Sequence, residues 1–204
     1  MEAKLLLLPW FMGVLYSSIP LFWFVIHPFA GSWRKFRRSP YRVLLPLWMI
    51  IILALAWIAW PWRGVELYHP LRGWGTMAAG PALGFLWLGV TVYRKTFSDF
   101  GGHKLSGEAE LRPEEHTQTL VVTGLHARMR HPIYVGHLSM LAGWSLISGL
   151  VVNFVLFAVC VLVTFPLMIW LEECELEKRF GENFGEYKAR VPLLPIPGFK
   201  GTRA

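Results

Sequence analysis

The sequence predicts an all-α integral membrane protein with five transmembrane helices, and three observations lead to this fold class. The chain is 54% hydrophobic and only 16% charged, whereas a soluble domain carries about 25% charged residues. Several uncharged runs reach the roughly 20 residues that a membrane-spanning helix needs. The basic residues gather in alternate segments between these runs, as the positive-inside rule requires. The net charge of +7 therefore indicates membrane lipids as partners and no nucleic acid.

Three apolar runs in the first half of the chain predict three spans. The first covers residues 5–26 and is expected to be a span and not a cleaved signal, because no small-x-small cleavage site follows it. Pro9 and Pro20 are tolerable inside it, because neighbouring helices can satisfy the freed carbonyl groups. The second run, residues 43–60, ends at tryptophans typical of a membrane interface. The third, residues 74–93, is rich in glycine, which allows other helices to approach closely.

The second half of the chain contains the longest uncharged run, residues 132–171. As one helix this run would extend about 60 Å, roughly twice the hydrocarbon core, so it must fold back on itself. Ser148 and Gly149 supply the expected turn, which makes a helical hairpin of two spans. The polar segment before the hairpin contains an expected flexible loop at 101–107 and a short β-type run at 119–125.

The distribution of basic residues predicts the orientation in the membrane. Seventeen of the 20 lysines and arginines follow the first span, the third span or the hairpin. The amino terminus should therefore lie outside and the carboxyl terminus in the cytoplasm, at the inner membrane if the source is prokaryotic. We expect one integrated domain, in which residues 1–93 form three spans and residues 94–204 form the cofactor-binding catalytic half.

The hairpin should bring two polar motifs to one interface, Arg130 and His131 at its entrance and Glu172 and Glu173 at its exit. Because adjacent helical residues point about 100° apart, we expect the two carboxylates to face different partners, one holding Arg130 and the other facing a ligand. The proline after His131 opens a helix there, and helix amino termini attract carboxylates and phosphates. The Tyr134 hydroxyl should lie nearby. The alternative is that these charged residues only anchor the ends of the spans at the membrane surface and bind no ligand.

The tail after the hairpin predicts an amphipathic helix along the membrane interface. Its apolar residues recur every three or four positions: Leu176, Phe180, Phe184, Tyr187 and Val191. We interpret this stripe as membrane anchoring. Arg190 precedes the prolines that end the helix, so its guanidinium either orients an acidic substrate group or extends to lipid phosphate.

No metal site is expected. The five histidines of the second half match no compact ligand pattern: His103, His116, His126, His131 and His137. His137, inside the hairpin, is interpreted as a neutral packing residue, with a place on a cavity wall as the alternative. Cys160 and Cys174 are expected to be packing residues. The sequence also lacks GxGxxG, P-loop and HExxH motifs, so a soluble-type nucleotide fold is not predicted.

The second half resembles the isoprenylcysteine carboxyl methyltransferase family of integral membrane enzymes and their bacterial and archaeal relatives. Over residues 119–198 the family pattern is met in order by "RHPIYVG", by "EE" after two spans, and by "FGENFGEYKARVP". The sequence departs from the pattern in two places. Leu125 and His126 stand where relatives usually have proline or isoleucine and then tyrosine, and Phe184 replaces the first tyrosine of the tail.

The resemblance implies S-adenosylmethionine as the cofactor, bound at the cytoplasmic interface without a metal. By position, His131 and Tyr134 would hold its methionine part, Glu173 would hold its ribose or amino group, and the segment after Arg190 would hold its adenine. The implied cofactor-binding residues are His131, Tyr134, Gly124, Leu125, Glu173, Val191, Pro192 and Leu194. The implied catalytic residues are Arg190, which would contact the acceptor, Arg130 as polar support, and Glu172.

The resemblance further implies methyl transfer to a lipophilic small-molecule or lipidated acceptor. Such an acceptor could enter sideways from the bilayer, between the glycine-rich third span and the hairpin. In this displacement the protein mainly aligns the reactants and excludes water. A carboxylate acceptor, as in isoprenylcysteine, is favoured because it needs no general base, and no evident base is present. A phospholipid amine and a thiol are alternatives.

Two other functions remain open. A membrane sterol-type reductase using NADPH is one alternative, although Ile133 stands where such reductases have asparagine. A non-enzymatic transport or interaction protein is the other, although it would place polar groups at mid-membrane and not at one interface.

Overall fold

The computed structural model describes residues 6–35, 40–100, 111–112, 119–195 and 198, and it shows an all-α membrane protein. Four helical segments are long and apolar enough to cross a membrane: Leu7–Trp33, Tyr41–Trp62, Gly73–Asp99 and Val151–Phe180. The described part of the chain contains no β-strand and only an isolated bridge between Glu66 and Leu150.

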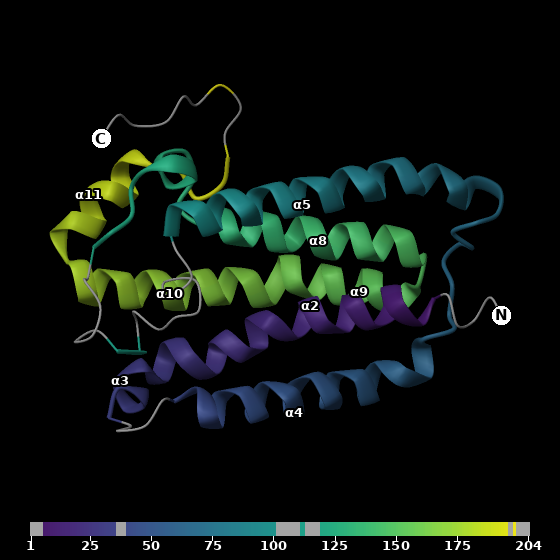
Figure 1. Ribbon diagram of the computed structural model, residues 1–204, viewed down its shortest axis with the longest axis horizontal. Helices are drawn as coiled ribbons and strands as arrows, with labels where there is room; N and C mark the ends of the chain where they lie inside the picture. The colour runs from purple at the N-terminus through teal and green to yellow at the C-terminus, as the bar shows by residue number, and fades with distance from the viewer. Residues whose placement is uncertain (1–5, 36–39, 101–110, 113–118, 196–197, 199–204) are drawn as a thin grey trace.

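The long helices run side by side along the longest axis of the molecule (Figure 1). Helices α5 and α8 form one neighbouring pair, and α2 lies between α4 and the helices of the second half. The amino terminus lies at one end of the bundle, and α3 and α11 lie at the other. In chain order the described helices are α2 (Leu7–Ile26), η1 (His27–Phe29), α3 (Ala30–Trp33), α4 (Tyr41–Ala59), η2 (Trp60–Trp62), η3 (Gly73–Ala78), α5 (Ala79–Phe100), η4 (Gly124–Ala127), α8 (Pro132–Ser148), α9 (Val151–Val159), η5 (Cys160–Thr164), α10 (Phe165–Phe180) and α11 (Glu182–Arg190).

The predicted turn of the hairpin is confirmed at its predicted residues. Helix α8 ends at Ser148, and Gly149 adopts a left-handed conformation with φ of 63°. A side chain at Gly149 would collide with the carbonyl oxygen of Tyr68, so both backbone conformation and space require glycine here. The Leu67 N–H donates to the Gly149 carbonyl at 2.7 Å, which attaches the loop before α5 to the turn.

The second arm of the hairpin runs through α9, η5 and α10 without a break. Pro166 has no N–H to donate to the carbonyl four residues earlier, and the widened π-helical turn η5 lies immediately before it. The arm therefore continues to Phe180 and carries Glu172 and Glu173 to the end of the bundle where Arg130 and His131 begin the first arm.

Glycines bring α5 and α8 into close contact, as expected for the third span. A side-chain carbon at Gly89 of α5 would lie 2.7 Å from Met140 Sδ and 2.9 Å from the carbonyl oxygen of Gly136. Gly143 of α8 is packed equally closely against Leu86. Where these residues meet, α5 and α8 are in direct contact, and whether an acceptor enters elsewhere between the third span and the hairpin stays a prediction.

The Tyr16 carbonyl group, which Pro20 frees in the first span, has a partner on a neighbouring helix, as predicted. Pro20 cannot donate to the Tyr16 carbonyl, and Nε2 of His137 in α8 donates to that oxygen at 2.7 Å. Near the other end of α2, the amide of the buried Asn153 donates to the Pro9 carbonyl at 3.0 Å. Two side chains of the hairpin thus connect it to α2.

Two predictions of secondary structure are wrong. Residues 119–125 form no strand, because no neighbouring strand is available among the described residues, and Leu120 and Val122 pack on Phe184 instead. The tail is not one helix either. Gly181, with φ of 52° and ψ of −128°, ends α10 and separates it from α11. The predicted loop at 101–107 lies outside the described residues.

The close contact of α5 and α8 leads to a prediction about Gly89. A Gly89→Ala change should destabilise the protein by roughly 1–3 kcal/mol, because the added carbon must push Met140 and the α8 backbone away. Gly84→Ala is the matched control on the same helix, since nothing lies within 4 Å of its position, and it should be neutral or slightly stabilising. Thermal unfolding in detergent, followed by tryptophan fluorescence, measures both. Equal melting temperatures for the two variants would contradict this packing.

Candidate functional site

A cavity of about 530 Å³ lies between α2, α4, α5, α8, α10 and α11. This volume falls within the range of small-molecule sites, about 300–1,000 Å³. One part of its wall is charged or polar and includes His131, Glu172 and Arg179. Another part, formed by the first two helices, is apolar and includes Leu15 and Trp48. The cavity can therefore hold a molecule with charged groups beside one with an apolar body.

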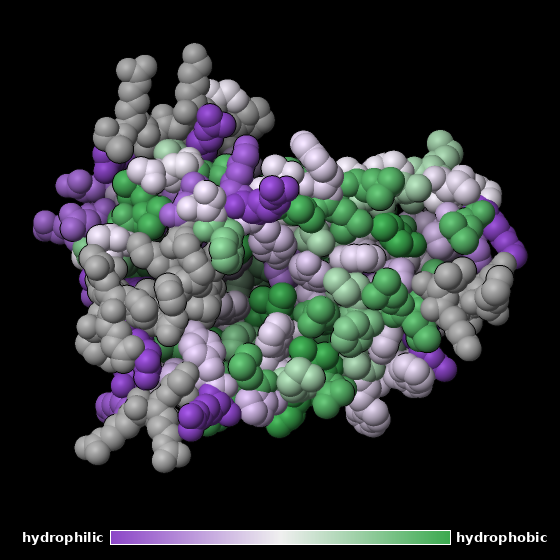
Figure 2. Space-filling model, in the orientation of Figure 1, coloured by the Kyte–Doolittle hydropathy of each residue, from purple (hydrophilic) through white to green (hydrophobic). Residues whose placement is uncertain are grey.

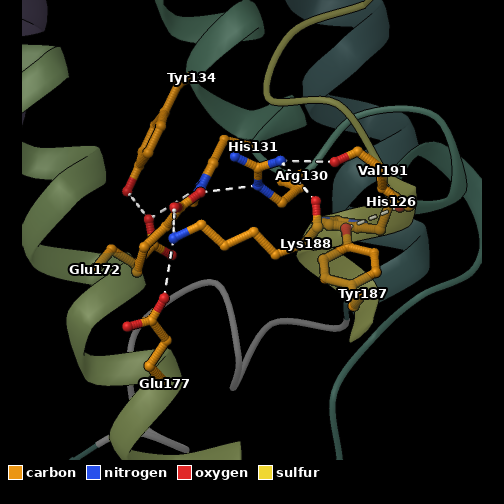
Figure 3. Close-up of polar contacts among 10 residues, drawn as sticks. His126, Arg130, His131, Tyr134, Glu172, Glu177, Tyr187, Lys188 and Val191 are labelled. Carbon is orange, nitrogen blue, oxygen red and sulfur yellow. Dashed lines mark hydrogen bonds and ion pairs between the residues drawn. The ribbon is translucent and has the colours of Figure 1, made fainter. Parts of the chain in front are cut away.

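His131 joins the two predicted motifs at the polar end of the cavity (Figure 3). Its Nδ1 lies 3.2 Å from Oε2 of Glu172, and its Nε2 lies 3.1 Å from Oε1 of Glu173. The expectation that adjacent carboxylates cannot share a partner is wrong, because the two ring nitrogens of one imidazole point to different sides and each reaches one carboxylate. The expectation that one carboxylate holds Arg130 is confirmed for Glu173. Glu172 lines the cavity and Glu173 does not, so the implied contact of Glu173 with a cofactor stays a prediction.

Arg130 connects the hairpin to the segment after α11. Its Nε donates to Oε1 of Glu173 at 2.8 Å, and its Nη1 donates to the Val191 carbonyl at 2.6 Å. Its backbone N–H donates to the Pro192 carbonyl at 2.9 Å. Lys188 adds a second cation, 2.9 Å from Oε2 of Glu173. With these contacts the Arg130 side chain serves as a support that holds the tail against the site.

Tyr134 completes the polar cluster one turn into α8. Its hydroxyl donates to the carboxylate of Glu172, and its ring stacks on His131 at a centroid distance of 5.3 Å and an interplanar angle of 5°. The Phe165 ring contacts the rings of Tyr134 and His137. His131, immediately before α8, and Tyr134 and His137 in α8 thus follow one another along the cavity.

Electrostatics give the two histidines at the start of the hairpin opposite protonation states. Burial lowers the pKa of His131, but the charges and hydrogen bonds of Glu172 and Glu173 outweigh burial and raise the pKa to about 9. His131 is therefore an imidazolium at neutral pH. Burial lowers the pKa of His126 to about 4 against the opposing charge of Asp99, so His126 is neutral.

The loop before α8 borders the cavity, as the resemblance implied for the cofactor. Gly124 has φ of 59°, and a side chain there would collide with the Asp99 carboxylate. That carboxylate accepts a hydrogen bond from the backbone N–H of Leu125 at 3.0 Å. His126 is buried and lines the cavity. Whether Gly124 and Leu125 contact a cofactor stays a prediction.

The predicted residues of the tail lie in three different settings. Val191 is buried and its carbonyl is held by Arg130, whereas the Leu194 side chain is 51% exposed. Pro192 is half-buried. Arg190 is exposed, its Nε donates to the Glu186 carbonyl of its own helix at 3.2 Å, and it does not line the cavity. The roles assigned to these residues stay predictions.

The aromatic stripe of the tail does not serve as a plain membrane anchor, which corrects our interpretation. Leu176, Phe180, Phe184 and Tyr187 all line the cavity, and Phe184 is only 1% exposed. The Tyr187 hydroxyl donates to the His126 carbonyl at 2.8 Å. The 3.6-residue period identified one apolar face correctly, but this face packs on the protein.

Sequence reasoning missed Arg179 and His27 on the cavity wall. Arg179 follows Glu172 by seven residues, and Glu172, Leu176 and Arg179 line the cavity from one face of α10. That spacing was a usable signal. His27, just after the first apolar run, is buried and stacks on Trp23 at 5.1 Å, and only the packing of α2 brings it to the cavity. Among the described residues no group of three or more potential metal ligands is found.

Comparison with known proteins gives two kinds of match. The family model described as phospholipid methyltransferase matches residues 80–183. Protein-S-isoprenylcysteine O-methyltransferase of Schizosaccharomyces pombe is 32% identical over 111 residues, which are 54% of this chain and 46% of that protein. Protein-S-isoprenylcysteine O-methyltransferase B of Arabidopsis thaliana is 35% identical over 101 residues, 50% of this chain and 51% of that protein.

A third relative aligns with more of the chain. Methanethiol S-methyltransferase 2 of Bradyrhizobium diazoefficiens is 27% identical over 188 residues, which are 81% of this chain and 64% of that protein. The chain thus spans about half the length of the first two relatives and less than two thirds of the third. No solved structure matches the chain significantly. The resemblance to isoprenylcysteine carboxyl methyltransferases is confirmed by these matches.

The charge of His131 leads to a prediction about pH. Because the pKa of His131 is about 9 in the folded protein and near 6.5 in an unfolded chain, its stabilisation is complete below pH 6.5 and is lost as the pH rises through 9. The free energy of unfolding should fall by about 1.4 kcal/mol per pH unit within this window. Melting temperatures of the wild type and of His131→Asn between pH 6 and pH 10 test this. A difference between the two proteins that does not change with pH would contradict the assigned charge.

Proposed function

Because the chain belongs to the phospholipid methyltransferase family, we propose that it is a membrane methyltransferase that uses S-adenosylmethionine and acts on a lipophilic acceptor. The observation that carries this proposal is the cavity itself, which has a carboxylate and an imidazolium at one end and apolar residues of α2 and α4 at the other. A charged cofactor and an apolar acceptor can meet in such a space.

The residues at the polar end suit the amino-acid part of S-adenosylmethionine, which carries both charges. Glu172 faces the cavity and can accept hydrogen bonds from an ammonium group. The first turn of α8 offers backbone N–H groups for a carboxylate, while both ring nitrogens of His131 are already paired with Glu172 and Glu173. When bound, the cofactor would supply an electrophilic methyl group on a sulfonium. The loop of Gly124 and Leu125 and the segment after Val191 are the proposed neighbours of its adenosine part.

The remaining task of the protein is to align the acceptor and exclude water. Helix α11 covers the cavity with Phe184 and Tyr187, and the Arg130 contacts hold the segment after this helix in place. A water-poor site strengthens the interaction of the acceptor with nearby charges. By covering the cavity, α11 therefore supports catalysis, and none of its residues takes part in proton transfer.

The acceptor that we propose first is a carboxylate, as in isoprenylcysteine. It needs no base, two relatives that each align with about half of this chain are named for isoprenylcysteine, and the cavity-lining Arg179 offers a guanidinium. A thiol is the second candidate, because the relative that aligns with 81% of this chain is named for methanethiol. A phospholipid amine fits the family description, and an NADPH reductase and a transport protein remain less well supported alternatives.

We also propose that the chain spans the membrane five times as one integrated domain, with three spans in residues 1–93 and the catalytic half in 94–204. Helix α8 has 17 residues, about 26 Å at 1.5 Å per residue, which is close to the hydrocarbon thickness. Apolar side chains cover the length of the bundle, and hydrophilic ones gather at the end that carries α11 (Figure 2). The excess of basic residues at this end supports our proposal that it lies, with its site, on the cytoplasmic side of the membrane.

The proposed topology predicts which engineered cysteines react in intact cells. Gly64→Cys lies in the exposed loop at the amino-terminal end of the bundle, and Glu186→Cys lies on the exposed face of α11 at the other end. A membrane-impermeant maleimide should label the first and spare the second until the cells are opened. The reverse pattern would show that the site faces outside.

The proposed cofactor site predicts weaker cofactor binding when one carboxylate, Glu172, loses its charge, and normal binding when an exposed carboxylate, Glu186, does. Wild-type protein in nanodiscs should bind S-adenosylmethionine without added metal. Glu172→Gln should weaken binding about tenfold to a hundredfold, because a charge-assisted hydrogen bond contributes roughly 1.5–3 kcal/mol. Glu186→Gln, an exposed carboxylate of α11, is the matched control and should bind normally. Isothermal titration measures all three, and wild-type binding of NADPH alone would support the reductase instead.

Turnover, measured beside the same titration, separates the two arginines considered for the acceptor. Arg179→Ala should retain cofactor affinity and lose turnover on a lipophilic carboxylate, because the acceptor is no longer aligned. Arg190→Ala should have little effect on either quantity. If Arg190→Ala alone lowers turnover, the exposed guanidinium is the acceptor contact, as the sequence first indicated.

A further inference from the structure

Tyr93, His137 and the Tyr16 backbone form a hydrogen-bonded chain on the cavity wall, outside the charged cluster. The Tyr93 hydroxyl lies 2.7 Å from Nδ1 of His137, and Nε2 of His137 lies 2.7 Å from the Tyr16 carbonyl oxygen. Tyr16, Tyr93 and His137 all line the cavity, from α2, α5 and α8 respectively. Three separate elements therefore build this arrangement.

The chemistry of the partners determines where each proton lies. A carbonyl oxygen can only accept, so Nε2 of His137 carries the hydrogen that it donates to Tyr16. Nδ1 of the neutral ring then has a lone pair, and it accepts the hydrogen of the Tyr93 hydroxyl. Pro20 explains why the Tyr16 carbonyl is available for this contact. The Tyr93 oxygen consequently presents only lone pairs to the cavity.

A second observation points to a ligand at the same place. Thr96 follows Tyr93 by one helical turn, lines the cavity and is 1% exposed, and its hydroxyl has no hydrogen-bond partner among the described residues. A buried hydroxyl without a partner costs free energy. This one can donate to an anion beside Tyr93.

From this geometry we propose that Tyr93 and His137 form a proton relay that deprotonates a lipophilic thiol in the cavity. The thiol S–H donates to the Tyr93 oxygen and its bond breaks as a new O–H bond forms. The original Tyr93 O–H bond breaks, and its proton passes to Nδ1 of His137. His137 becomes an imidazolium that still donates to the Tyr16 carbonyl, and the Thr96 hydroxyl donates to the thiolate. Tyr93 is the catalytic residue, and His137 acts through it.

The relay fits a thiol and is not needed for a carboxylate. A carboxylate is already ionised at neutral pH and has no hydrogen to donate to the Tyr93 lone pairs. The resulting thiolate is the nucleophile that S-methylation requires. The inference rests on the proposed methyltransferase function and identifies a class of acceptor for it.

His137 lies close to the proposed cofactor site because of its position in α8. It follows Tyr134 by three residues, which is about 4.5 Å along the helix axis. Both rings contact Phe165, at centroid distances of 5.4 Å for Tyr134 and 5.3 Å for His137. A thiol on Tyr93 would therefore lie one helical turn deeper in the bundle than the charged cluster.

The test uses decanethiol and decanoate as matched acceptors, with full-length protein in nanodiscs. His137→Gln is the decisive variant, because its amide can donate to the Tyr16 carbonyl and its oxygen can accept from Tyr93, but it cannot take up a proton. S-methylation should fall by about 10²- to 10⁴-fold, whereas methylation of decanoate and binding of S-adenosylmethionine should change less than about threefold. Tyr93→Phe should show the same selective loss.

Two further measurements keep the outcome unambiguous. Tyr68→Phe removes a hydroxyl that donates to the Leu146 carbonyl at 2.7 Å outside the cavity, and it should leave both activities near normal. S-methylation by His137→Gln should rise with pH as thiolate forms in solution, whereas S-methylation by the wild type should already be fast at neutral pH because the relay removes the proton. The inference is overturned if S-methylation has the same pH dependence in both proteins, or if His137→Gln loses both activities equally. A wild type that neither binds S-adenosylmethionine nor methylates either acceptor would instead reject the proposed function.

Discussion

The pairing of His131 with Glu172 and Glu173 is the interaction on which the polar end of the molecule depends. One imidazolium contacts both carboxylates, and Tyr134 donates to Glu172. Arg130 shares Oε1 of Glu173 with the imidazolium, and Lys188 contacts Oε2 of Glu173. Removing one member would leave a buried charge without its partner. The free-energy cost of this unpaired charge is larger than the net stabilisation that the intact ion pairs provide. Through Arg130 the same cluster also positions the segment after α11.

A second constraint comes from the glycines between α5 and α8. Because Gly89, Gly136 and Gly143 remove side chains from this interface, the two backbones come close enough for Tyr93 of α5 to reach His137 of α8. The same two helices then present Tyr93, Thr96 and His137 to one cavity. Close packing of small residues is thus what places polar groups deep in an apolar bundle.

These two constraints give the cavity two chemically different regions. The charged region around Glu172 and His131 suits a zwitterionic amino-acid group, and the deeper region around Tyr93 and Thr96 suits a group that donates a hydrogen. The methyl donor and the acceptor would therefore bind in different regions of one cavity because their charges differ, and this arrangement requires no domain movement. The apolar side chains of α2 and α4 complete the deeper region.

Much of the fold and part of the site could be predicted from local patterns. Apolar length identified the helices, the excess length of residues 132–171 required a hairpin, and Gly149 ends its first arm as expected. The meeting of Arg130 and His131 with Glu172 and Glu173 followed from that hairpin alone. Prediction failed where the outcome depends on a neighbour: residues 119–125 found no partner strand, and the stripe that contains Phe184 faces the cavity and not lipid.

The sequence by itself determined the helices, the turn and the two charged motifs, because hydrophobic length, glycine and charge act over a few residues or along one helix. Only the tertiary structure decided that His131 bonds both carboxylates, that Arg190 lies outside the cavity while Arg179 lines it, and that His137 connects Tyr93 to the Tyr16 carbonyl. Each of these depends on the distance and rotation between helices. Side-chain volumes at distant contacts set that geometry, and no local pattern contains it.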